Sequence, residues 1–277
     1  MKTLYLSDLD GTLLNSNECI SEYTANAINQ FVKKGGCFSY ATARSIVTAS
    51  KVTVDLDIKL PVICYNGAFM FKNDTNEILL SNYFTPEEVE IASNILDGHD
   101  IYPIVYAYVD GVERFSYIEK YVTPTMRHFL NSRVGDPRRR SVSTAEALYS
   151  GQVFYFVCIG AEDSLFPINK IFKKDNRFNC IYQKDIYSGG QWCELLPIKA
   201  AKDIAALQLK SMLGCNKMVA FGDGHNDLSL FAAADECYAV ANAVPELKKI
   251  ATAVIGSNDS DGVAKWLEGC VTAYPKQ

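Results

Sequence analysis

The most constraining feature of this chain is a short apolar segment near the amino terminus that ends in two aspartates. Residues 4–12 read Leu-Tyr-Leu-Ser-Asp-Leu-Asp-Gly-Thr. In an extended strand alternate side chains share a face, so Asp8 and Asp10 emerge together while Leu9 turns toward the core. Such a pair suits a divalent cation, most simply Mg2+, and it also suits a nucleophile beside a proton donor. A strand ending in an ordinary turn is the alternative, because Asp-Gly is a common turn signal.

A second strand-like segment ends in the same way. Residues 217–221 are apolar after the first lysine, and Gly-Asp-Gly-His-Asn-Asp follows at residues 222–227. If this strand neighbours the first, Asp223 meets Asp8 and Asp10, and a bound cation would relieve their mutual repulsion. A glycine-rich turn with a helix-capping aspartate is the simpler interpretation.

The first segments alternate between strand and helix patterns. Expected strands at 37–41 and 60–65 alternate with helices, one capped by Ser21 and another over residues 45–54. This order predicts an α/β fold, with a parallel sheet wrapped by helices and ligands beyond the carboxyl ends of the strands. The polar residues expected at that edge are Asp8, Asp10, Thr42 and Asn66.

The middle of the chain has a different texture, richer in aromatic residues and turns. We expect a separate α+β unit at 83–188, inserted between two parts of a discontinuous core domain at 1–82 and 189–277. The parallel pattern is expected to resume after Gly189-Gly190 with a strand at 192–196.

Composition excludes several classes of function. The 277 residues are 48% hydrophobic, enough for a large core, and the net charge of -5 does not favour nucleic-acid binding. The Arg138-Arg139-Arg140 cluster is expected to be a solvated loop. No apolar stretch approaches the ~18 residues of a membrane span, and the amino terminus does not resemble a signal peptide. Nine scattered cysteines without zinc spacing suggest reduced, buried thiols in a cytoplasmic protein. The sequence does not predict the oligomeric state.

Together the motifs resemble the haloacid dehalogenase superfamily, in particular its Cof-type phosphatases. The 8–12 segment is similar to the nucleophile motif, Thr42 to the second motif, and Gly222-Asp223 with Asn226-Asp227 to the metal motif. The third motif is a lysine, and both Lys199 and Lys202 qualify by position. In the Cof-type pattern this lysine lies five residues after a proline, which selects Lys202 after Pro197. Asp203 stands where that pattern usually has glycine. Asn66-Gly67-Ala68, Asn242-Ala243 and Asp261-Gly262 also resemble Cof-type sequence.

This resemblance implies a Rossmann-like three-layer core, an inserted α+β cap of the large (type IIB) kind, and Mg2+-dependent hydrolysis of small phosphate esters. Asp8 would be the nucleophile that forms an aspartyl-phosphate, and Asp10 would exchange protons with the leaving group and water. The metal would be held by Asp8, the Asp10 carbonyl and Asp223, with Asp227 orienting a metal-bound water. The groups implied for phosphate are the Leu9 and Ala43 amides, the Thr42 hydroxyl, Lys202 and Asn226. Arg44 and Asn66 are further candidates for substrate contact, and sugar phosphates are the first substrate class to consider.

Other interpretations remain open at this point. A phosphomutase of the same superfamily would use the same aspartates, and a non-catalytic sugar-phosphate sensor would use the same binding groups. A receiver domain also places aspartates, threonine and lysine around Mg2+, but it is far shorter. Simpler roles also exist for single residues, such as a helix cap for Thr42, a surface ion pair for Arg44 and a loop position for His225.

Overall fold

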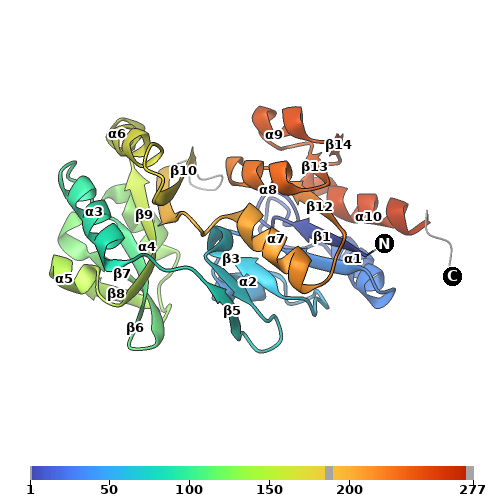
Figure 1. Ribbon diagram of the computed structural model, residues 1–277, viewed down its shortest axis with the longest axis horizontal. Helices are drawn as coiled ribbons and strands as arrows, with labels where there is room; N and C mark the ends of the chain where they lie inside the picture. The colour runs from blue at the N-terminus through green and yellow to red at the C-terminus, as the bar shows by residue number, and fades with distance from the viewer. Residues whose placement is uncertain (1, 185–189, 273–277) are drawn as a thin grey trace. The chain divides into compact units, whose positions relative to one another are not determined.

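The chain forms two compact units, shown in Figure 1. The computed structural model describes residues 2–184 and 190–272, with side chains up to residue 269. The discontinuous unit consists of Met1–Ser81 and Ala200–Gln277, and the inserted unit consists of Asn82–Lys199. The first boundary lies one residue before the expected one. The second boundary, after Lys199, lies eleven residues beyond the expected boundary after residue 188.

The discontinuous unit is built on a five-stranded parallel sheet with the order β14-β13-β12-β1-β2. Strand β1 therefore lies between β2 and β12.

 

The two neighbours of β1 come from distant parts of the chain. Leu6 of β1 pairs with Ser39 of β2 on one side and with Ala220 of β12 on the other. The α/β fold with a parallel sheet is therefore confirmed. The strands of this sheet are β1 (Thr3–Ser7), β2 (Cys37–Tyr40), β12 (Lys217–Gly222), β13 (Glu236–Val240) and β14 (Ala253–Ile255).

Helices cover both faces of this sheet. The Tyr5 ring on β1 contacts Phe31 at 5.0 Å and Trp266 at 6.2 Å between centroids, so α1 and α10 pack on one face. Helices α7 and α8 pack together on the other face (Figure 1). The helices of this unit are α1 (Glu22–Lys33), α2 (Ile46–Val52), α7 (Lys202–Met212), α8 (Leu228–Ala233), α9 (Pro245–Ile250) and α10 (Gly262–Thr272).

Helix α1 shows how local sequence sets these elements. The Ser21 hydroxyl accepts a hydrogen bond from the Thr24 amide, which satisfies a backbone donor that the first turn leaves unpaired. Ala27, Ile28 and Phe31 recur at helical spacing and are all buried. The cap agrees with the sequence prediction.

The segment at 60–65 does not join the parallel sheet as a full strand. Strand β3 (Val62–Cys64) belongs to a separate three-stranded antiparallel sheet with β4 (Phe69–Phe71) and β5 (Ile78–Ser81). Among the described residues, one isolated parallel bridge between Ala41 and Ile63 links it to the end of β2. The apolar pattern identified the strand, but an alternating or continuous apolar run does not specify the partner strand.

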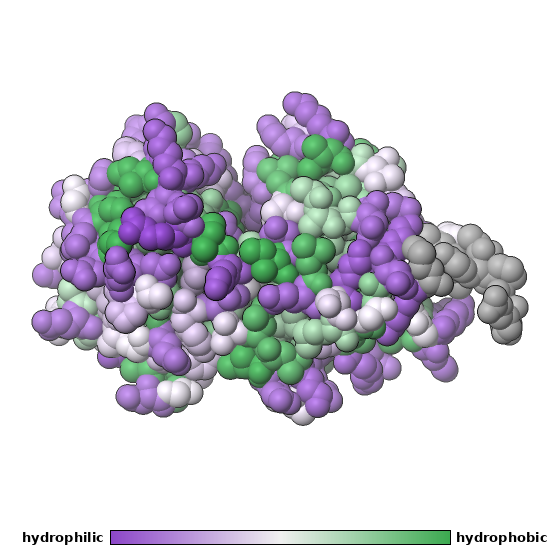
Figure 2. Space-filling model, in the orientation of Figure 1, coloured by the Kyte–Doolittle hydropathy of each residue, from purple (hydrophilic) through white to green (hydrophobic). Residues whose placement is uncertain are grey.

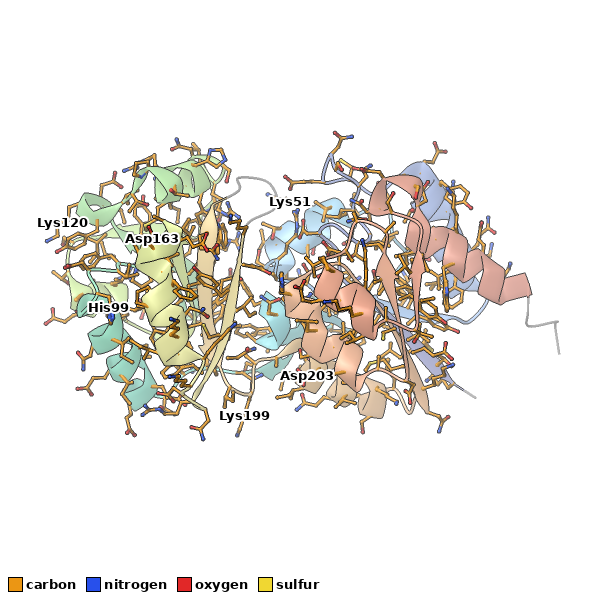
Figure 3. The ribbon with its side chains drawn as sticks, turned by 90° about the horizontal axis from the view of Figure 1, so that it is seen from above. Lys51, His99, Lys120, Asp163, Lys199 and Asp203 are labelled. Carbon is orange, nitrogen blue, oxygen red and sulfur yellow. The ribbon has the colours of Figure 1, made fainter. Side chains whose placement is uncertain are left out.

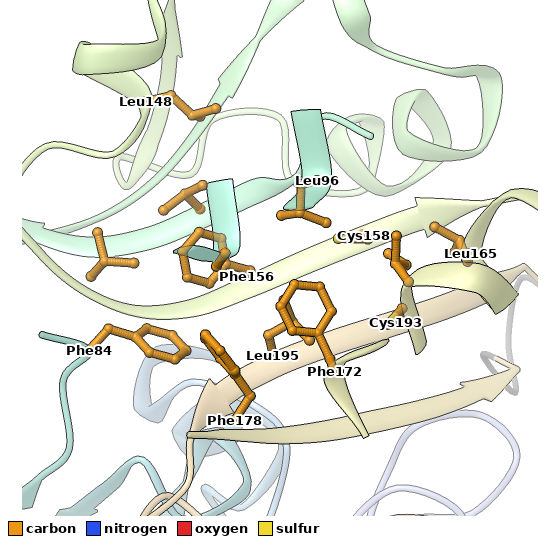
Figure 4. Close-up of a cluster of buried hydrophobic side chains, with 14 of the residues drawn as sticks. Phe84, Leu96, Leu148, Phe156, Cys158, Leu165, Phe172, Phe178, Cys193 and Leu195 are labelled. Atoms are coloured by element: carbon orange, nitrogen blue, oxygen red, sulfur yellow. The ribbon is translucent and has the colours of Figure 1, made fainter. Parts of the chain in front are cut away.

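The inserted unit is a six-stranded sheet with the order β10-β11-β9-β6-β7-β8. A cluster of buried apolar side chains, including Phe84, Leu96, Phe156 and Phe172, joins the sheet to its helices (Figure 4). This unit thus has its own hydrophobic core, as an independent folding unit requires. Its strands are β6 (Ile104–Val109), β7 (Val112–Ile118), β8 (Arg139–Val142), β9 (Gln152–Gly160), β10 (Phe178–Lys184) and β11 (Gln191–Pro197). Its helices are α3 (Pro86–Asp97), α4 (Pro124–Asn131), α5 (Ala145–Leu148) and α6 (Glu162–Phe172).

The assignment of residues 192–196 to the parallel core is wrong. Strand β11 pairs antiparallel with both β9 and β10, in the sheet of the inserted unit. Its Cys193 and Leu195 side chains join the buried cluster of that unit. The boundary therefore moves to Lys199, because β11 completes the inserted sheet before the chain returns to α7.

The arginine run at 138–140 is not a solvated loop. Arg139 and Arg140 begin strand β8, and Arg138 is only 7% exposed. The Arg138 guanidinium pairs with Glu113 and Asp136, at 2.7 Å in each case. These two carboxylates neutralise the buried charge. The run of three adjacent arginines in the sequence does not indicate these partners.

The surface and the cysteines complete the description of the fold. Figure 2 shows a face on which hydrophobic patches are interrupted by hydrophilic residues. No helix in the described ranges combines the length and hydrophobicity needed to cross a bilayer. The eight described cysteines are free thiols. Five are buried, whereas Cys19 is exposed, and Cys37 and Cys180 are half-buried, so the expectation of burial holds only in part.

Candidate active site

The register of the parallel sheet brings the two acidic turns together. Ser7 pairs with Phe221 at the ends of β1 and β12, and the Asp8 amide donates to the Phe221 carbonyl at 2.9 Å. The turns that follow these strands therefore leave the same edge. Carboxylate oxygens of Asp8, Asp223 and Asp227 all lie within 4.8 Å of one another. We call these three residues the carboxylate cluster.

A buried lysine lies against this cluster. The Lys202 ammonium donates to Asp8 at 2.5 Å and to Asp227 at 2.7 Å, and its side chain is 1% exposed. Lys202 is the first residue of α7, and the start of that helix approaches Gly67 closely. A Cβ on Gly67 would lie 2.3 Å from the Ala201 carbonyl oxygen, so this approach requires glycine.

The other candidate lysine is in a different environment. Lys199 is exposed and belongs to the inserted unit, and Figure 3 shows it at the outer edge of the chain. Asp203, also labelled there, lies in the first turn of α7 next to Lys202. An acidic side chain is favourable at that end of a helix.

The turn after β1 fixes the position of Asp223. The Thr12 hydroxyl donates to Asp223 Oδ1 at 3.0 Å. Gly11 has a φ of +72°, and a Cβ there would lie 2.3 Å from Asp223 Oδ2. Asp227 closes its own turn, since its Oδ2 accepts from the Asp223 and Gly224 amides at 3.0 Å each. Each member of the carboxylate cluster is thus held by at least one hydrogen bond.

Burial and crowding shift the ionisation of these groups. Burial, with repulsion from Asp227, raises the pKa of Asp223 to about 7, although the Thr12 hydrogen bond opposes the shift. Burial also raises the pKa of Asp8 well above its ordinary value; Lys202 opposes this, and Asp227 and Asp223 add to it. Burial alone lowers the pKa of Lys202, but Asp227 and Asp8 outweigh it and the net shift is upward.

The donor set of the cluster fits a hard divalent cation. When all three carboxylates are ionised, they and the one ammonium leave two formal negative charges in a largely buried site. A divalent cation with a preference for oxygen ligands would neutralise this excess, and the carboxylate oxygens lie close enough together to share one ion.

Asp10 lies outside the carboxylate cluster. Its two carboxylate oxygens accept from Arg44 Nε at 2.8 Å and Arg44 Nη2 at 2.6 Å. The same Nη2 also donates to Glu18 at 2.8 Å. Such a two-point ion pair fixes the orientation of a carboxylate. Arg44 therefore contacts a predicted catalytic residue.

The remaining predicted residues lie around the same edge of the sheet. The Thr42 hydroxyl is buried and accepts from the Arg44 amide at 3.1 Å, and Ala43 between them is half-buried. Asn66, 1% exposed, accepts at Oδ1 from Asn226 Nδ2 at 3.1 Å. The Leu9 side chain is buried, as expected. His225 is exposed, but it begins a short 3-10 helix, η3 (His225–Asp227), rather than lying in a loop.

Sequence reasoning gave no role to two residues that contact the candidate site. Thr12 belongs to the first motif, but its contact with Asp223 spans 211 residues and leaves no local signal. Glu18 pairs with Arg44 from a loop in which it has a φ of +57°, an uncommon conformation for glutamate. Neither contact follows from spacing or periodicity.

Comparisons with known proteins agree with this geometry. A family model described as haloacid dehalogenase-like hydrolase matches residues 5–267. The chain is 28% identical over 283 residues to the 5-amino-6-(5-phospho-D-ribitylamino)uracil phosphatase YwtE of Bacillus subtilis, with 94% of this chain and 95% of that protein covered. It is 23% identical over 266 residues to YitU of the same organism, which has the same enzyme name, with 94% of this chain and 94% of that protein covered. The solved structure of the HAD subclass IIB sugar phosphatase BT4131 has a TM-score of 0.77 at 19% identity and covers 98% of this chain and 99% of that one.

The chain belongs to the haloacid dehalogenase-like hydrolase family, because the family model spans nearly its whole length. Within this family it is a phosphatase, in agreement with the curated relatives it matches.

Proposed function

We propose that this phosphatase uses Mg2+ to hydrolyse small phosphorylated metabolites, sugar phosphates first, through an aspartyl-phosphate on Asp8. The observation that carries the proposal is the position of Asp8, which contacts buried Lys202 and lies within the carboxylate cluster. The names of the relatives add support, since two act on a phosphorylated ribityl compound and a structural neighbour is a sugar phosphatase.

The roles of the charged groups follow from their surroundings. Asp8 would attack phosphorus and take the phosphoryl group, while the bond between phosphorus and the leaving-group oxygen breaks. Lys202 would keep Asp8 anionic and place positive charge beside the incoming phosphate. Mg2+ held by Asp8 and Asp223, with Asp227 close by and the Asp10 carbonyl as a further ligand, would supply additional charge neutralisation.

Asp10 would act on protons rather than on phosphorus. We propose that it protonates the leaving oxygen and then accepts a proton from the hydrolytic water. The main role of Arg44 would be to hold Asp10 in position, rather than to contact the substrate directly. Thr42, Asn226, and the amides of Leu9 and Ala43 remain the proposed phosphate contacts, and Asn66 would act by holding Asn226.

We also propose that the inserted unit serves as a cap that selects the leaving group and excludes bulk water. Its compact fold and separate core support this role. A Mg2+-containing screen over sugar phosphates, nucleotides and phosphorylated ribityl compounds tests the substrate class. We expect phosphate release to be highest with sugar or sugar-alcohol phosphates. Interconversion of hexose phosphate isomers without phosphate release would indicate a mutase and contradict the proposal.

Stabilisation by Mg2+ is expected to depend strongly on pH. Because the pKa of Asp223 is raised to about 7, the folded metal-free protein binds more protons than the unfolded chain below that pH. Its unfolding free energy therefore falls as the pH rises from ~4 through about 7, and deprotonated carboxylates become available to the cation. We expect saturating Mg2+ to raise the thermal midpoint by about 5–10 °C near pH 8 and by less than half as much near pH 5.

Thermal unfolding with and without Mg2+ at the two pH values measures this effect. Asp223→Asn is the matched control, because it removes the titrating carboxyl while keeping its size. It should lose most of the Mg2+ effect near pH 8. An equal shift in the wild-type protein at both pH values would contradict the assignment of the cluster to the cation.

Replacing Arg44 with lysine tests its proposed positioning role. Lysine keeps the positive charge but loses the two-point geometry that holds Asp10. We expect kcat to fall about tenfold, a part of what proton transfer contributes, while KM and the Mg2+-dependent midpoint shift stay near wild type. Glu18→Gln, which leaves the Arg44–Asp10 pair intact, should change kcat much less. A raised KM with unchanged kcat in Arg44→Lys would instead indicate direct substrate contact.

A further inference from the structure

One contact at the candidate site is not explained by the proposed chemistry. Asn242, just after β13, donates from Nδ2 to the Gly11 carbonyl at 2.6 Å. Its Oδ1 accepts from the Asn258 amide at 3.1 Å. A single side-chain amide thus connects the turn after β1 to two distant parts of the chain.

The residue that Asn242 holds lies directly against the carboxylate cluster. Gly11 packs so closely on Asp223 that a Cβ would lie 2.3 Å from Oδ2, and the next residue, Thr12, donates to Oδ1 at 3.0 Å. The Thr12 hydroxyl thus contacts one oxygen of this carboxylate, and the Gly11 backbone leaves no room for a Cβ beside the other. A movement of the turn would therefore release Asp223 from both contacts at once.

We propose that Asn242 is a positioning residue for the cation site. By holding the Gly11 carbonyl, it keeps the turn that carries Thr12 against Asp223, and so it increases the affinity of the site for Mg2+. Groups that orient metal ligands commonly matter almost as much as the ligands themselves. The inference rests on the proposed function, since it assumes that Asp223 binds the cation.

Asn258, whose backbone amide donates to Asn242, provides a matched comparison. Its Nδ2 donates to the Leu14 carbonyl at 3.0 Å, which is a similar contact beyond the part of the turn that touches Asp223. If these amides only tie loops together, removal of either one should have the same effect. If Asn242 positions Asp223, only its removal should weaken Mg2+ binding.

The experiment is a Mg2+ titration of the 277-residue chain, followed by the thermal midpoint rather than by activity. Asn242 is exposed, so its substitution should leave the fold intact. We expect Asn242→Ala to raise the apparent Kd for Mg2+ roughly three- to tenfold, the range for loss of one hydrogen bond. Asn258→Ala should stay within about twofold of wild type.

Two further variants separate positioning from charge. Asn242→Asp keeps the acceptor for the Asn258 amide but loses the donor to Gly11. Its added negative charge would by itself attract the cation, so weaker binding in this variant indicates loss of position. Thr12→Val removes the hydroxyl contact with Asp223. Because both sites act through one carboxylate, Asn242→Ala combined with Thr12→Val should weaken binding by less than the product of the single effects.

The outcomes distinguish this inference from the proposed function. Normal Mg2+ binding by the wild-type protein, with Asn242→Ala unchanged or no weaker than Asn258→Ala, would overturn the positioning role alone. Failure of the wild-type protein to bind Mg2+ would overturn both. Weaker binding in Asn242→Ala and Asn242→Asp, with Asn258→Ala unaffected, supports both.

Discussion

Replacing Asp8 with asparagine is expected to reduce kcat by ~10^4-fold or more, as removal of other enzymatic nucleophiles does. The amide is a poor nucleophile, and it cannot form the acyl phosphate that the proposed route requires. The substitution removes one of the two carboxylates that contact Lys202, and Asp227 remains to pair with it. The fold should therefore persist. Phosphate release with Mg2+ and a reactive phosphate ester measures the loss, and circular dichroism checks the fold.

Two related variants sharpen this test. Asp8→Glu keeps the charge but moves the carboxylate by one methylene, and a displacement of that size costs on the order of 10^2-fold or more in rate. Asp10→Asn keeps the nucleophile and should still transfer the phosphoryl group from an ester whose leaving group needs no proton. Substantial turnover by a correctly folded Asp8→Asn variant would count against the nucleophile assignment.

Replacing Lys202 with methionine is expected to lower the unfolding free energy of the metal-free protein by about 3–5 kcal/mol, the usual cost of leaving buried charges unpaired. Methionine fills a similar volume but donates no hydrogen bond. The two carboxylates that Lys202 contacts, Asp8 and Asp227, are 6% and 0% exposed and would have to be protonated or rehydrated. Denaturant unfolding near pH 8 measures the change. Phosphatase activity should fall as well, because positive charge is lost beside the phosphate.

Lys199→Met is the control for this prediction. Lys199 lies three residues earlier and is exposed, so its loss should change stability by no more than about 0.5 kcal/mol. Saturating Mg2+ should recover part of the stability lost in Lys202→Met, since both cations interact with the same carboxylates. Equal stability of the two variants would show that the Lys202 contacts contribute little.

Much of the fold was predictable because the signals are local. The Ser21 cap and the apolar runs of β1 and β12 each depend on a few adjacent residues. The positions at the carboxyl end of the parallel sheet were predictable for the same reason, since strand ends and parallel order determine which residues share an edge. Asp8 and Asp223 were placed together on this basis, and their carboxylates lie together in the structure.

The features that the sequence did not reveal depend on long-range pairing. Strand β11 has a clear strand pattern, but nothing within it specifies β9 and β10 as partners. Arg138 is buried because Glu113, twenty-five residues away, neutralises it. Likewise, the bond from Asn242 to Gly11 exists only in the folded chain. In each case the energy comes from a partner that local spacing does not identify.

The most direct test of the account is to locate the phosphoryl group during turnover. Asp10→Asn, mixed with Mg2+ and a reactive phosphate ester and then quenched with acid, should accumulate phosphoenzyme, because its hydrolysis lacks the proposed base. Mass spectrometry of the peptides should find one phosphoryl group, on Asp8. A phosphoryl group on another residue, or phosphate release by Asp10→Asn at the wild-type rate with no phosphoenzyme, would contradict the account.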